Sequence, residues 1–384
     1  MDGAAVTPLV ILGATGSIGR QTLDVADRLD IPVAAVAARR GSEELLAIAR
    51  SHPEADVGVA APTGAERELF TSELGRRASF GTDSMIELAG RPGVTVVNGV
   101  VGAAGLAASV AALEAGNRLA LANKESLVAG GPVLQQARRQ GGGELLPVDS
   151  EHSAILQCLT GEDLSAVGRL ILTASGGPFR GRDAESLASV TAQEALAHPT
   201  WSMGPRITID SATLMNKAFE VIEAHLLFDL SYDQIDVVVH PQSIVHSLVE
   251  FVDGSLKAHL GEPDMRVPIQ YAITHPTRRP GPLAPFPLAG QTLTFESPDP
   301  VAFPLLEIGY EAGRRGDSAP AALNAADEVA VQAFLDGRIG FSAIPRVVEG
   351  ALERVPVRKL EAIADVVAVD AEARSIATEL AGTC

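Results

Sequence analysis

In Leu9-Val10-Ile11-Leu12-Gly13-Ala14-Thr15-Gly16-Ser17-Ile18-Gly19-Arg20-Gln21, an apolar strand runs into a glycine-rich turn and the start of a helix. Gly13 permits the tight turn, Gly16 lets the backbone approach a pyrophosphate, and Gly19 allows the helix to pack closely on the strand. Free N–H groups at the helix N-terminus, with the hydroxyls of Thr15 and Ser17, suit a diphosphate. The spacing is G-x-x-G-x-x-G rather than G-x-G-x-x-G, so a purely structural turn is the alternative.

Short apolar runs alternate with helical patterns over the first 150 residues. We expect strands at Leu9–Leu12, Val33–Ala37, Val57–Ala60, Val94–Val97, Leu119–Ala122 and Leu145–Val148, and helices at Gln21–Leu29, Glu43–Ser51, Ala65–Leu74, Leu106–Ala115 and Val133–Arg139. Near-continuous apolar strands separated by helices indicate a parallel sheet that is covered on both faces. The sequence therefore predicts an α/β fold with an N-terminal doubly wound, Rossmann-like sheet over residues 1–150.

The rest of the chain predicts two further domains. Residues 151–276 are α+β material, with strands at Leu170–Thr173, Ile235–Val239, Val245–Val252 and Ser255–Leu260 and a helix at Thr213–Phe228. The dipeptide Asp253-Gly254 is a strong hairpin signal, because glycine tolerates positive φ. Dense prolines predict an extended linker over 277–300, and residues 301–384 read as a C-terminal helical domain, for example at Ala321–Leu335 and Ala343–Glu353.

The composition excludes several classes of partner. With 30 Lys and Arg against 48 Asp and Glu, the 384-residue chain carries a net charge of −18, so we expect no nucleic-acid partner and no membrane partner. The long uncharged stretch 92–113 is rich in glycine and alanine, which favours a buried strand and helix over a membrane span. Two cysteines fit a reducing, cytoplasmic location, and we expect no signal peptide at the start.

The end of the second predicted strand bears on the choice of dinucleotide. An acidic residue there would bind the ribose 2′-hydroxyl of NAD, but this chain has Ala38-Arg39-Arg40. Two guanidinium groups suit a 2′-phosphate through charge-assisted hydrogen bonds. NADPH is therefore favoured over NADH, with the alternative that Arg40 is only a solvated residue at a helix start.

Paired carboxylates follow the last strand of the first domain. Asp149 and Glu151 are two positions apart, so an extended backbone would point both to one side. Carboxylate oxygens suit Mg²⁺ or Mn²⁺. The alternative is a helix start, with Asp149 or Ser150 as N-cap and Glu151 in the first turn.

The run from Ser211 to Glu220 favours the metal. Asn216, Lys217 and Glu220 share one helix face by their spacing, and Ser211 is expected at that helix's N-terminus, where phosphate binds well. Glu220 could supply a third carboxylate to the same metal. The alternative is an ordinary Lys–Glu surface pair.

Three other segments are expected to face a ligand. Ser175 opens a glycine-rich turn that could offer its hydroxyl and backbone N–H groups to an anion. The loop 197–205 carries the only tryptophan, Trp201, between prolines and a glycine, and reads as a flap that closes over a ligand or as a buried anchor. Lys124 lies just past a strand, where it could bind substrate oxygens while Asn123 and Glu125 face the cofactor. We expect the histidines at 225, 240, 246, 259 and 275 to be structural.

Taken together, these segments resemble the 1-deoxy-D-xylulose 5-phosphate reductoisomerase family over nearly the whole chain. The motifs that carry the resemblance are Gly13–Gly19, Asn123-Lys124-Glu125, Asp149-Ser150-Glu151, Ser175-Gly176-Gly177-Pro178-Phe179, His198-Pro199-Thr200-Trp201-Ser202-Met203-Gly204, Ser211–Glu220, His240-Pro241-Gln242-Ser243, Gly261-Glu262-Pro263-Asp264-Met265-Arg266 and Leu323-Asn324-Ala325-Ala326-Asp327-Glu328. The family often has glycine, a basic residue and then Asn or Ser where this chain has Ala38-Arg39-Arg40, which leaves the roles of Ala38 and Arg40 open.

The resemblance implies an NADPH-dependent enzyme of isoprenoid precursor biosynthesis that needs Mg²⁺, Mn²⁺ or Co²⁺ and is usually a homodimer. It implies NADPH contacts at Gly13, Thr15, Gly16, Ser17, Ile18, Arg39, Arg40, Asn123, Glu125 and Gly204. It implies metal ligation by Asp149, Glu151 and Glu220, and sugar-phosphate contacts at Lys124, Ser150, Glu151, Ser175, His198, Ser211, Asn216, Lys217 and Glu220. Among these, the catalytic residues would be Lys124, Asp149, Glu151, Glu220 and His198.

Two other functions fit parts of the sequence. Another NADPH-dependent reductase, such as a semialdehyde dehydrogenase, can have a similar turn but needs a thiol nucleophile. Cys158 lies in the apolar pattern Ile155-Leu156-Cys158-Leu159, which predicts a buried thiol. A non-catalytic sensor of NADPH or a sugar phosphate is the other candidate, and the presence of Lys124 with all three carboxylates argues against it.

Overall fold

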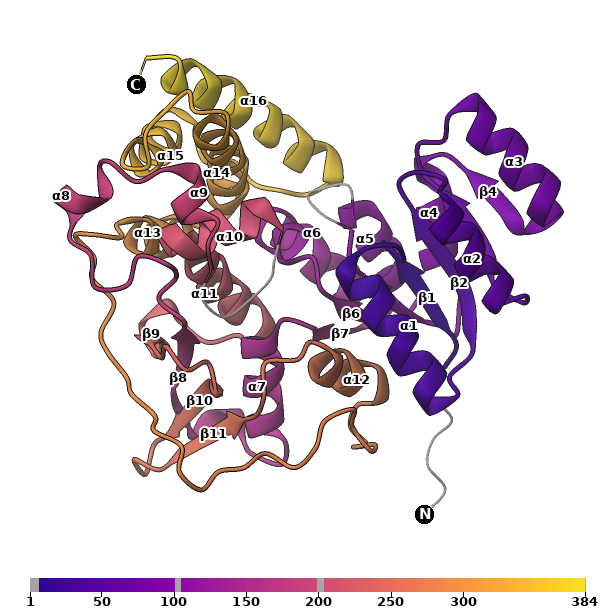
Figure 1. Ribbon diagram of the computed structural model, residues 1–384, viewed down its shortest axis with the longest axis horizontal. Coiled ribbons are helices and arrows are strands. Elements are labelled where there is room, and N and C mark those ends of the chain that lie inside the picture. The colour runs from indigo at the N-terminus through magenta and orange to yellow at the C-terminus, as the bar shows by residue number, and fades with distance from the viewer. Residues whose placement is uncertain (1–6, 101–104, 199–203, 384) are drawn as a thin grey trace. The chain divides into compact units, whose positions relative to one another are not determined.

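The computed structural model describes residues 7–100, 105–198 and 204–383 (Figure 1). Its contacts divide the chain into two compact units. The first comprises Met1–Ser126, Val133–Ser153 and Asp264–Ala284, and the second comprises Leu127–Pro132, Ala154–Pro263 and Pro285–Cys384. Ala154–Pro263 and Pro285–Cys384 belong to one compact unit. The predicted division into one domain at 151–276 and another at 301–384 therefore stays a prediction.

The first unit is built on a seven-stranded sheet in the order β4-β3-β2-β1-β5-β6-β7. All of its recorded strand pairs are parallel. The strands are β1 (Leu9–Leu12), β2 (Val33–Ala38), β3 (Asp56–Val59), β4 (Ala78–Phe80), β5 (Thr95–Asn98), β6 (Arg118–Leu121) and β7 (Glu144–Pro147). The order reverses between β1 and β5, and such a switch point creates a ligand crevice at the carboxyl ends of the strands.

Helices connect consecutive strands of this sheet, as parallel pairing requires. They are α1 (Ser17–Leu29), α2 (Glu43–Ser51), α3 (Gly64–Leu74), α4 (Thr82–Ala89), α5 (Leu106–Glu114) and α6 (Lys124–Gly141). All four residues of β1 are buried, as expected for a central strand covered on both faces. The α/β fold class and the Rossmann-like sheet predicted from the sequence are confirmed.

Helix α12 (Arg266–Thr274) packs in this first unit although it lies far along the chain. Arg28 donates to Gln270 at 2.6 Å, and Arg118 donates to the carbonyl of Ile273 at 3.0 Å. These bonds join the helix to α1 and β6, so the chain returns to the first unit after the central segment. Sequence periodicity carries no signal for such a return.

The second unit holds a mixed sheet in the order β11-β10-β8-β9. Its strands are β8 (Val167–Ala174), β9 (Ile235–Val239), β10 (Val245–Phe251) and β11 (Leu256–Leu260). β8 and β9 are parallel, whereas β10 is antiparallel to both β8 and β11. The predicted hairpin at Asp253-Gly254 is confirmed, with Gly254 at φ 82°.

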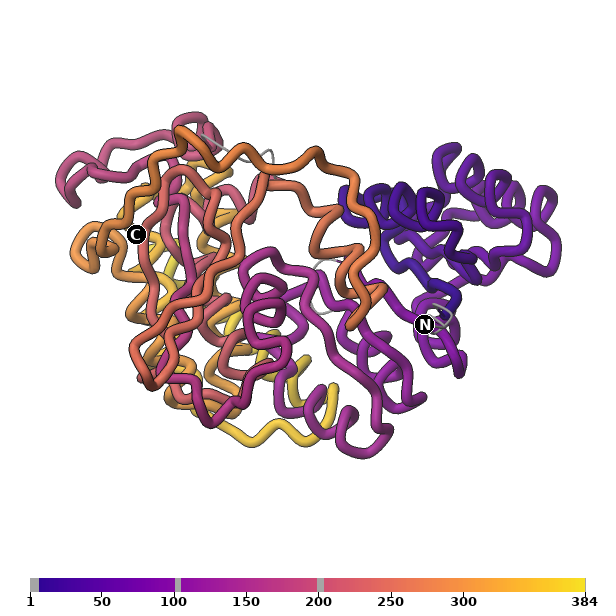
Figure 2. Tube along the Cα trace, turned by 90° about the horizontal axis from the view of Figure 1, so that it is seen from below, coloured from indigo at the N-terminus to yellow at the C-terminus, as the bar shows by residue number. Residues whose placement is uncertain are grey.

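The helices of this unit include the predicted C-terminal group. They are α8 (Ala184–Leu187), α9 (Ala192–Ala195), α10 (Pro205–Thr213), α11 (Met215–Phe228), α13 (Leu305–Arg315), α14 (Ala319–Leu335), α15 (Ala343–Arg354) and α16 (Ile363–Ala381), while α7 (Ser150–Leu159) contributes residues to both units. Residues 285–300 follow an extended path, orange in Figure 2, whose only pairing with a strand is the bridge between Glu296 and Val239.

The predicted helix Thr213–Phe228 is wrong at its start. Leu214 adopts φ 62°, which ends α10 and begins α11. The two helices pack on different partners, α10 on α14 and α11 on α13, so one straight helix could not serve both. Leu214 is 4% exposed, and burial of its side chain offsets the cost of the left-handed backbone.

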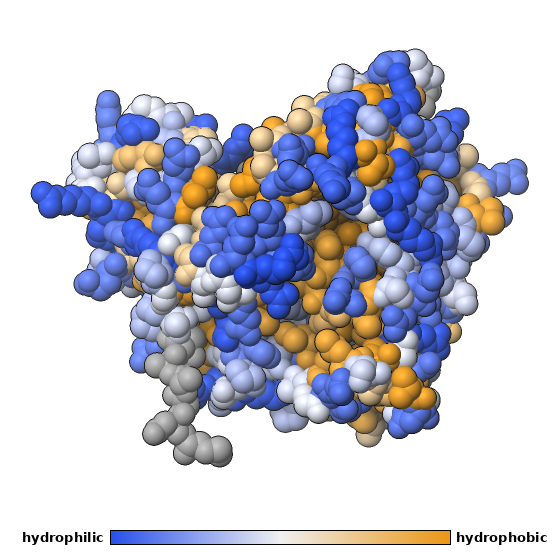
Figure 3. All heavy atoms as spheres, turned by 180° about the vertical axis from the view of Figure 1, so that it is seen from behind, coloured by the Kyte–Doolittle hydropathy of each residue, from blue (hydrophilic) through white to orange (hydrophobic). Residues whose placement is uncertain are grey.

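Hydrophilic side chains spread over the outer margins of the face in Figure 3, with hydrophobic ones exposed between them. None of the described helices combines the length and apolar character that crossing a membrane requires.

Candidate active site

The glycine-rich turn closes tightly between β1 and α1. The N–H groups of Gly13 and Ala14 both donate to the carbonyl of Ala37, at 2.8 and 2.9 Å, and Gly13 has φ 84°. A Cβ on Gly19 would lie 2.3 Å from the Gly13 oxygen, so only glycine allows this close approach. Gly16 is the N-cap of α1 and provides no side-chain cap. The first N–H groups of α1, with Thr15, Ser17 and Ile18, are therefore available to an anion.

The two arginines after β2 differ in their surroundings. Both are exposed, but Arg40 donates to Glu66 at 3.0 and 3.2 Å. Glu66 also caps α3 through the N–H of Thr63 at 2.9 Å, and that bond is the main reason why its pKa is lowered. Within the described ranges, the Arg39 side chain has no hydrogen bond or ion pair. The sequence did not distinguish the pair, and the structure makes Arg39 the guanidinium without a competing carboxylate.

Lys124 and its neighbours lie at the junction of β6 and α6. Asn123 is the N-cap of α6, and its side chain accepts from the N–H of Ser126 at 3.1 Å. Lys124 is 8% exposed and forms an ion pair with Asp149. Both residues follow neighbouring strands, β6 and β7, whose carboxyl ends lie at one edge of the sheet. Glu125 is half-buried in the first turn of α6.

The carboxylates after β7 are presented by a helix start rather than by extended backbone. The carbonyl of Asp149 accepts from the N–H of Ser153 at 2.8 Å, so α7 begins at Ser150 and Glu151 lies in its first turn. The hydroxyl of Ser150 donates to Glu151 at 2.5 Å. The geometric reason offered from the sequence, two carboxylates on one side of a strand, is therefore wrong.

Helix α11 presents its polar residues on one face, as predicted. Asn216 donates to Glu220 at 2.6 Å, and Lys217 forms an ion pair with the other oxygen of Glu220. Lys217 is 3% exposed and Glu220 is 1% exposed, which excludes an ordinary surface pair. Burying two charges costs desolvation free energy that their attraction often does not recover, so this pair is not explained by stability alone.

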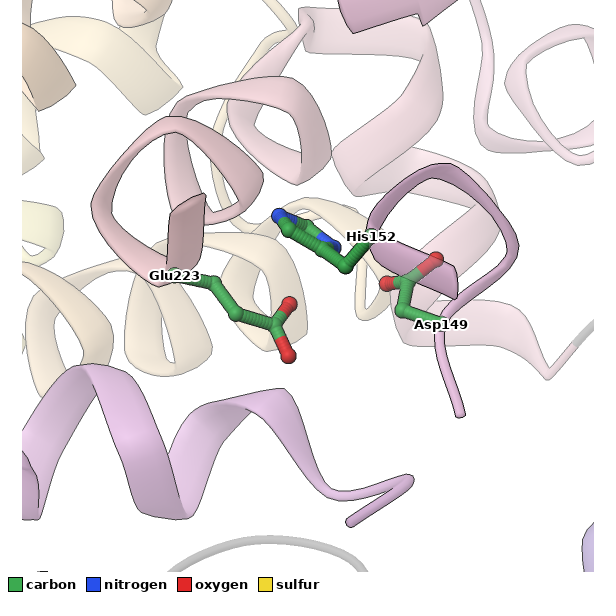
Figure 4. A group of neighbouring side chains, drawn as sticks. All are labelled: Asp149, His152 and Glu223. Carbon is green, nitrogen blue, oxygen red and sulfur yellow. The ribbon is translucent and has the colours of Figure 1, made fainter. Parts of the chain in front are cut away.

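The predicted carboxylate trio comes together. One potential ligand atom from each of Asp149, Glu151 and Glu220 lies within 4.8 Å of the other two. A second group, Asp149 with His152 and Glu223, meets the same criterion, and Figure 4 draws these three neighbouring side chains. His152 and Glu223 were missed from the sequence. Each lies three residues after a predicted ligand, Asp149 and Glu220 respectively, and that helical spacing was the available signal.

Ser175 and His198 meet in the second unit. The Ser175 hydroxyl lies 3.1 Å from Nε2 of His198 and accepts from the N–H of Gly177 at 3.2 Å. Burial lowers the pKa of His198, which favours its neutral ring. A Cβ on Gly177 would lie 2.8 Å from the carbonyl oxygen of Ser211, so this turn packs directly on α10.

Ser211 and Gly204 lie at opposite ends of α10. Ser211 lies in the last turn of α10, not at the N-terminus of the helix that carries Asn216, because Leu214 breaks the helix. Gly204 is the exposed N-cap of α10. The expectations for Trp201 and Met203 concern residues outside the described ones.

The remaining candidates have structural surroundings. His246 is 8% exposed, and burial lowers its pKa to about 4, so its ring is neutral at pH 7. Cys158 is buried, as the apolar pattern around it predicted.

A parallel sheet with a glycine-rich first turn, two arginines after its second strand and a carboxylate cluster define an NADP-dependent oxidoreductase of the Rossmann type. Sequence models of families refine this class. The model described as 1-deoxy-D-xylulose 5-phosphate reductoisomerase matches residues 9–131, that of its C-terminal domain matches 145–228, and that described as DXP reductoisomerase C-terminal domain matches 260–376. The chain belongs to the 1-deoxy-D-xylulose 5-phosphate reductoisomerase family, as its motifs had indicated.

Named relatives are similar over nearly their whole length. The 1-deoxy-D-xylulose 5-phosphate reductoisomerase of Heliobacterium modesticaldum is 50% identical over 381 residues, covering 97% of this chain and 97% of the relative. That of Xanthomonas oryzae pv. oryzae is 50% identical over 384 residues, covering 98% and 97%.

Solved structures agree with this assignment. The reductoisomerase from Zymomonas mobilis in complex with NADPH has a TM-score of 0.92 and 40% identity, covering 98% of this chain and 100% of that one. A reductoisomerase in complex with NADPH, fosmidomycin and magnesium has a TM-score of 0.91 and 38% identity, covering 98% of each chain.

Proposed function

We propose that this protein converts 1-deoxy-D-xylulose 5-phosphate into 2-C-methyl-D-erythritol 4-phosphate with NADPH and a divalent cation, in the non-mevalonate route to isoprenoid precursors. The observation that carries the proposal is that one potential ligand atom from each of Asp149, Glu151 and Glu220 lies within 4.8 Å of the other two. Three carboxylates so close repel one another, and a cation between them removes that repulsion.

The chemistry of the donor set fits the metal. Carboxylate oxygens are hard ligands of the kind that Mg²⁺ and Mn²⁺ select, and Co²⁺ also accepts them. In the described structure Lys124 neutralises Asp149 and Lys217 neutralises Glu220. Both ammonium groups can then move to substrate oxygens once a cation takes over the carboxylates.

The geometry of the first unit fits NADPH. The uncapped start of α1 and the hydroxyls of Thr15 and Ser17 would hold the diphosphate. Arg39 would hold the 2′-phosphate, because it lacks the carboxylate partner that engages Arg40. The further contacts that the family implies are Gly13, Gly16, Ile18, Asn123, Glu125 and Gly204.

The phosphate of the substrate would bind at the turn between β8 and α8 and on the helices beside it. Ser175, Ser211, Asn216 and Lys217 supply two hydroxyls, an amide and an ammonium, and His198 contacts Ser175 from the other side. Ser150 and Glu151 would hold the reacting end. Binding the remote phosphate orients that end, which raises the rate of the chemical step.

The overall reaction is a rearrangement followed by a reduction. The bound cation supplies a Lewis acid for the ketone and hydroxyl oxygens, and NADPH supplies the hydride that reduces the rearranged aldehyde. The chain's own part would be to hold the cation with Asp149, Glu151 and Glu220, to place Lys124 near the charge that develops on the substrate oxygens, and to exclude water. A homodimer and a cytoplasmic location remain predictions from the family resemblance and the cysteine count.

The test is NADPH oxidation with the pentulose phosphate in the presence and absence of EDTA. We expect metal-dependent turnover that Glu220→Gln and Asp149→Asn each abolish, with NADPH affinity within about twofold of the unmodified chain. Glu349→Gln, an exposed acid on α15, is the matched control and should leave turnover unchanged. Turnover that survives EDTA, or wild-type rates in either carboxamide variant, would rule out the metal assignment.

A further inference from the structure

An arginine at the start of α10 is held by several groups of α14. Arg206 donates to Glu328 at 2.6 Å and to Asn324 at 2.8 Å, and its guanidinium lies 3.5 Å from Asp327. On its own helix it lies 3.7 Å from Asp210, one turn further on. Asn324, Asp327 and Glu328 share one face of α14 by their spacing, so this single side chain joins the two helices.

Helix α16 contributes a second arginine to this network. Arg374 pairs with Glu328 and, at 2.6 Å, with Asp370. Glu328 therefore bridges two guanidinium groups. The cluster sets four carboxylates, those of Asp210, Asp327, Glu328 and Asp370, against two arginines, which leaves an excess of two negative charges if every carboxyl is ionised.

The centre of the cluster is dry. Asp210 is 2% exposed, Asp327 is 0% exposed and Asn324 is 2% exposed. Burial raises the pKa of Asp327 to about 6, with Arg206 opposing the shift. A buried ionic cluster adds little stability compared with apolar packing, and its best-attested use is to specify one arrangement.

What this cluster specifies is the end of α10. Ser211 follows Asp210 directly, and its carbonyl contacts the turn that carries Ser175, since a Cβ on Gly177 would lie 2.8 Å from that oxygen. The hydroxyl of Thr213 bonds back to the carbonyls of Ile209 and Asp210 at 3.0 and 3.2 Å. A shift of Asp210 would therefore move Ser211 relative to Ser175.

We propose that Arg206 and Asp327 are positioning residues for the phosphate pocket, which they serve by fixing α10 on α14 so that Ser211 stays beside the Ser175 turn. This inference rests on the proposed function, because it takes Ser175 and Ser211 as phosphate contacts. Neither residue is placed against substrate. Their effect is therefore expected on the affinity for phosphate and not on the affinity for NADPH.

The experiment measures binding of inorganic phosphate by calorimetry to the full-length protein with NADPH and Mg²⁺ present, together with KM and kcat for the sugar phosphate. We expect Arg206→Met to weaken phosphate binding and raise KM at least tenfold, with the dissociation constant of NADPH within twofold. Asp327→Asn keeps the shape and an acceptor oxygen, so a smaller loss of about threefold is expected. Arg206→Lys should recover part of the loss, because it keeps the charge without the fork.

Controls separate the possible failures. Arg354→Met removes an arginine whose ion pair joins α15 and α16 on the surface and should leave both affinities unchanged. Ser211→Ala tests the pocket itself. If Ser211→Ala leaves phosphate binding unchanged, the phosphate pocket is wrong and the inference falls with it. If Ser211→Ala weakens phosphate binding while Arg206→Met and Asp327→Asn only lower the urea midpoint, the cluster merely stabilises the fold and the positioning role is overturned.

Discussion

Replacing Gly19 by alanine tests the geometry of the dinucleotide turn directly. The new Cβ would lie 2.3 Å from the Gly13 oxygen, 2.5 Å from the Ala14 Cα and 2.6 Å from the Ala14 oxygen. All three atoms belong to the backbone of the turn, so no flexible side chain can move aside. The helix must shift away from the strand, or the turn must deform.

The magnitude follows from two opposed effects. Overpacking a rigid site costs roughly 1–3 kcal/mol, and alanine in place of glycine within a helix returns roughly 0.5–1 kcal/mol. We expect a net loss of about 1–2 kcal/mol in the free energy of unfolding. Because the strain falls on the N–H groups that would hold the diphosphate, NADPH affinity should drop at least tenfold, or about 1.4 kcal/mol.

Urea denaturation and a fluorescence titration with NADPH measure the two losses. Gly64→Ala is the matched control, since Gly64 is the first residue of α3 and a Cβ there would have no atom within 4 Å. It should leave NADPH binding unchanged and stability equal or slightly higher. If Gly19→Ala has the same urea midpoint and the same NADPH affinity as the unmodified chain, the close approach of α1 to the turn is not what organises this site.

Two further predictions concern single charged residues of the first unit. Arg39→Ala should weaken NADPH at least tenfold more than NADH, whereas Arg40→Ala should have a smaller effect because Arg40 is engaged by Glu66; equal losses of both dinucleotides in titrations of Arg39→Ala would remove Arg39 from the 2′-phosphate. The pKa of Asp264 is lowered, chiefly through its hydrogen bonds with Arg266. The stability that Asp264 adds is therefore fully present above the ordinary aspartate pKa of about 4. It is lost as the pH falls through the lower pKa of the folded state. Asp264→Asn should therefore lower the urea midpoint at pH 7 more than at pH 3, and a difference from the unmodified chain that is the same at both pH values would contradict this.

The strands of the first sheet could be predicted because burial on both faces writes a plain apolar run into the sequence. β1 (Leu9–Leu12) was predicted to the residue. β4 (Ala78–Phe80) was missed, since it has three residues, none of them buried, and lies at the edge of the sheet. Burial, which is the signal that sequence patterns carry, is weakest at an edge strand.

The predicted helix boundary was wrong where tertiary packing, and not the local sequence pattern, decides the backbone conformation. From Thr213 to Phe228 the sequence has no glycine or proline, so nothing in it announces a break. Leu214 takes a left-handed conformation that leucine disfavours, and only the separate partners of α10 and α11 explain why. The same break moved Ser211 from an expected helix start to a helix end.

The candidate site shows which contacts a sequence can foresee. Residues that follow neighbouring parallel strands, such as Lys124 and Asp149, meet because strand order alone brings them to one edge, and their ion pair was within reach of that reasoning. Arg206 and Asp327 are over a hundred residues apart in the chain, and no periodicity links their two helices. The sequence motif around Asp327 could be recognised, but explaining it required knowing that Arg206 lies beside it. Burying the Asp327 carboxyl without an arginine would cost desolvation free energy with no visible reason. With Arg206 beside it, Asp327 becomes one half of the contact that we propose locates Ser211. That is why the motif could support a family resemblance without revealing what its charged residues do.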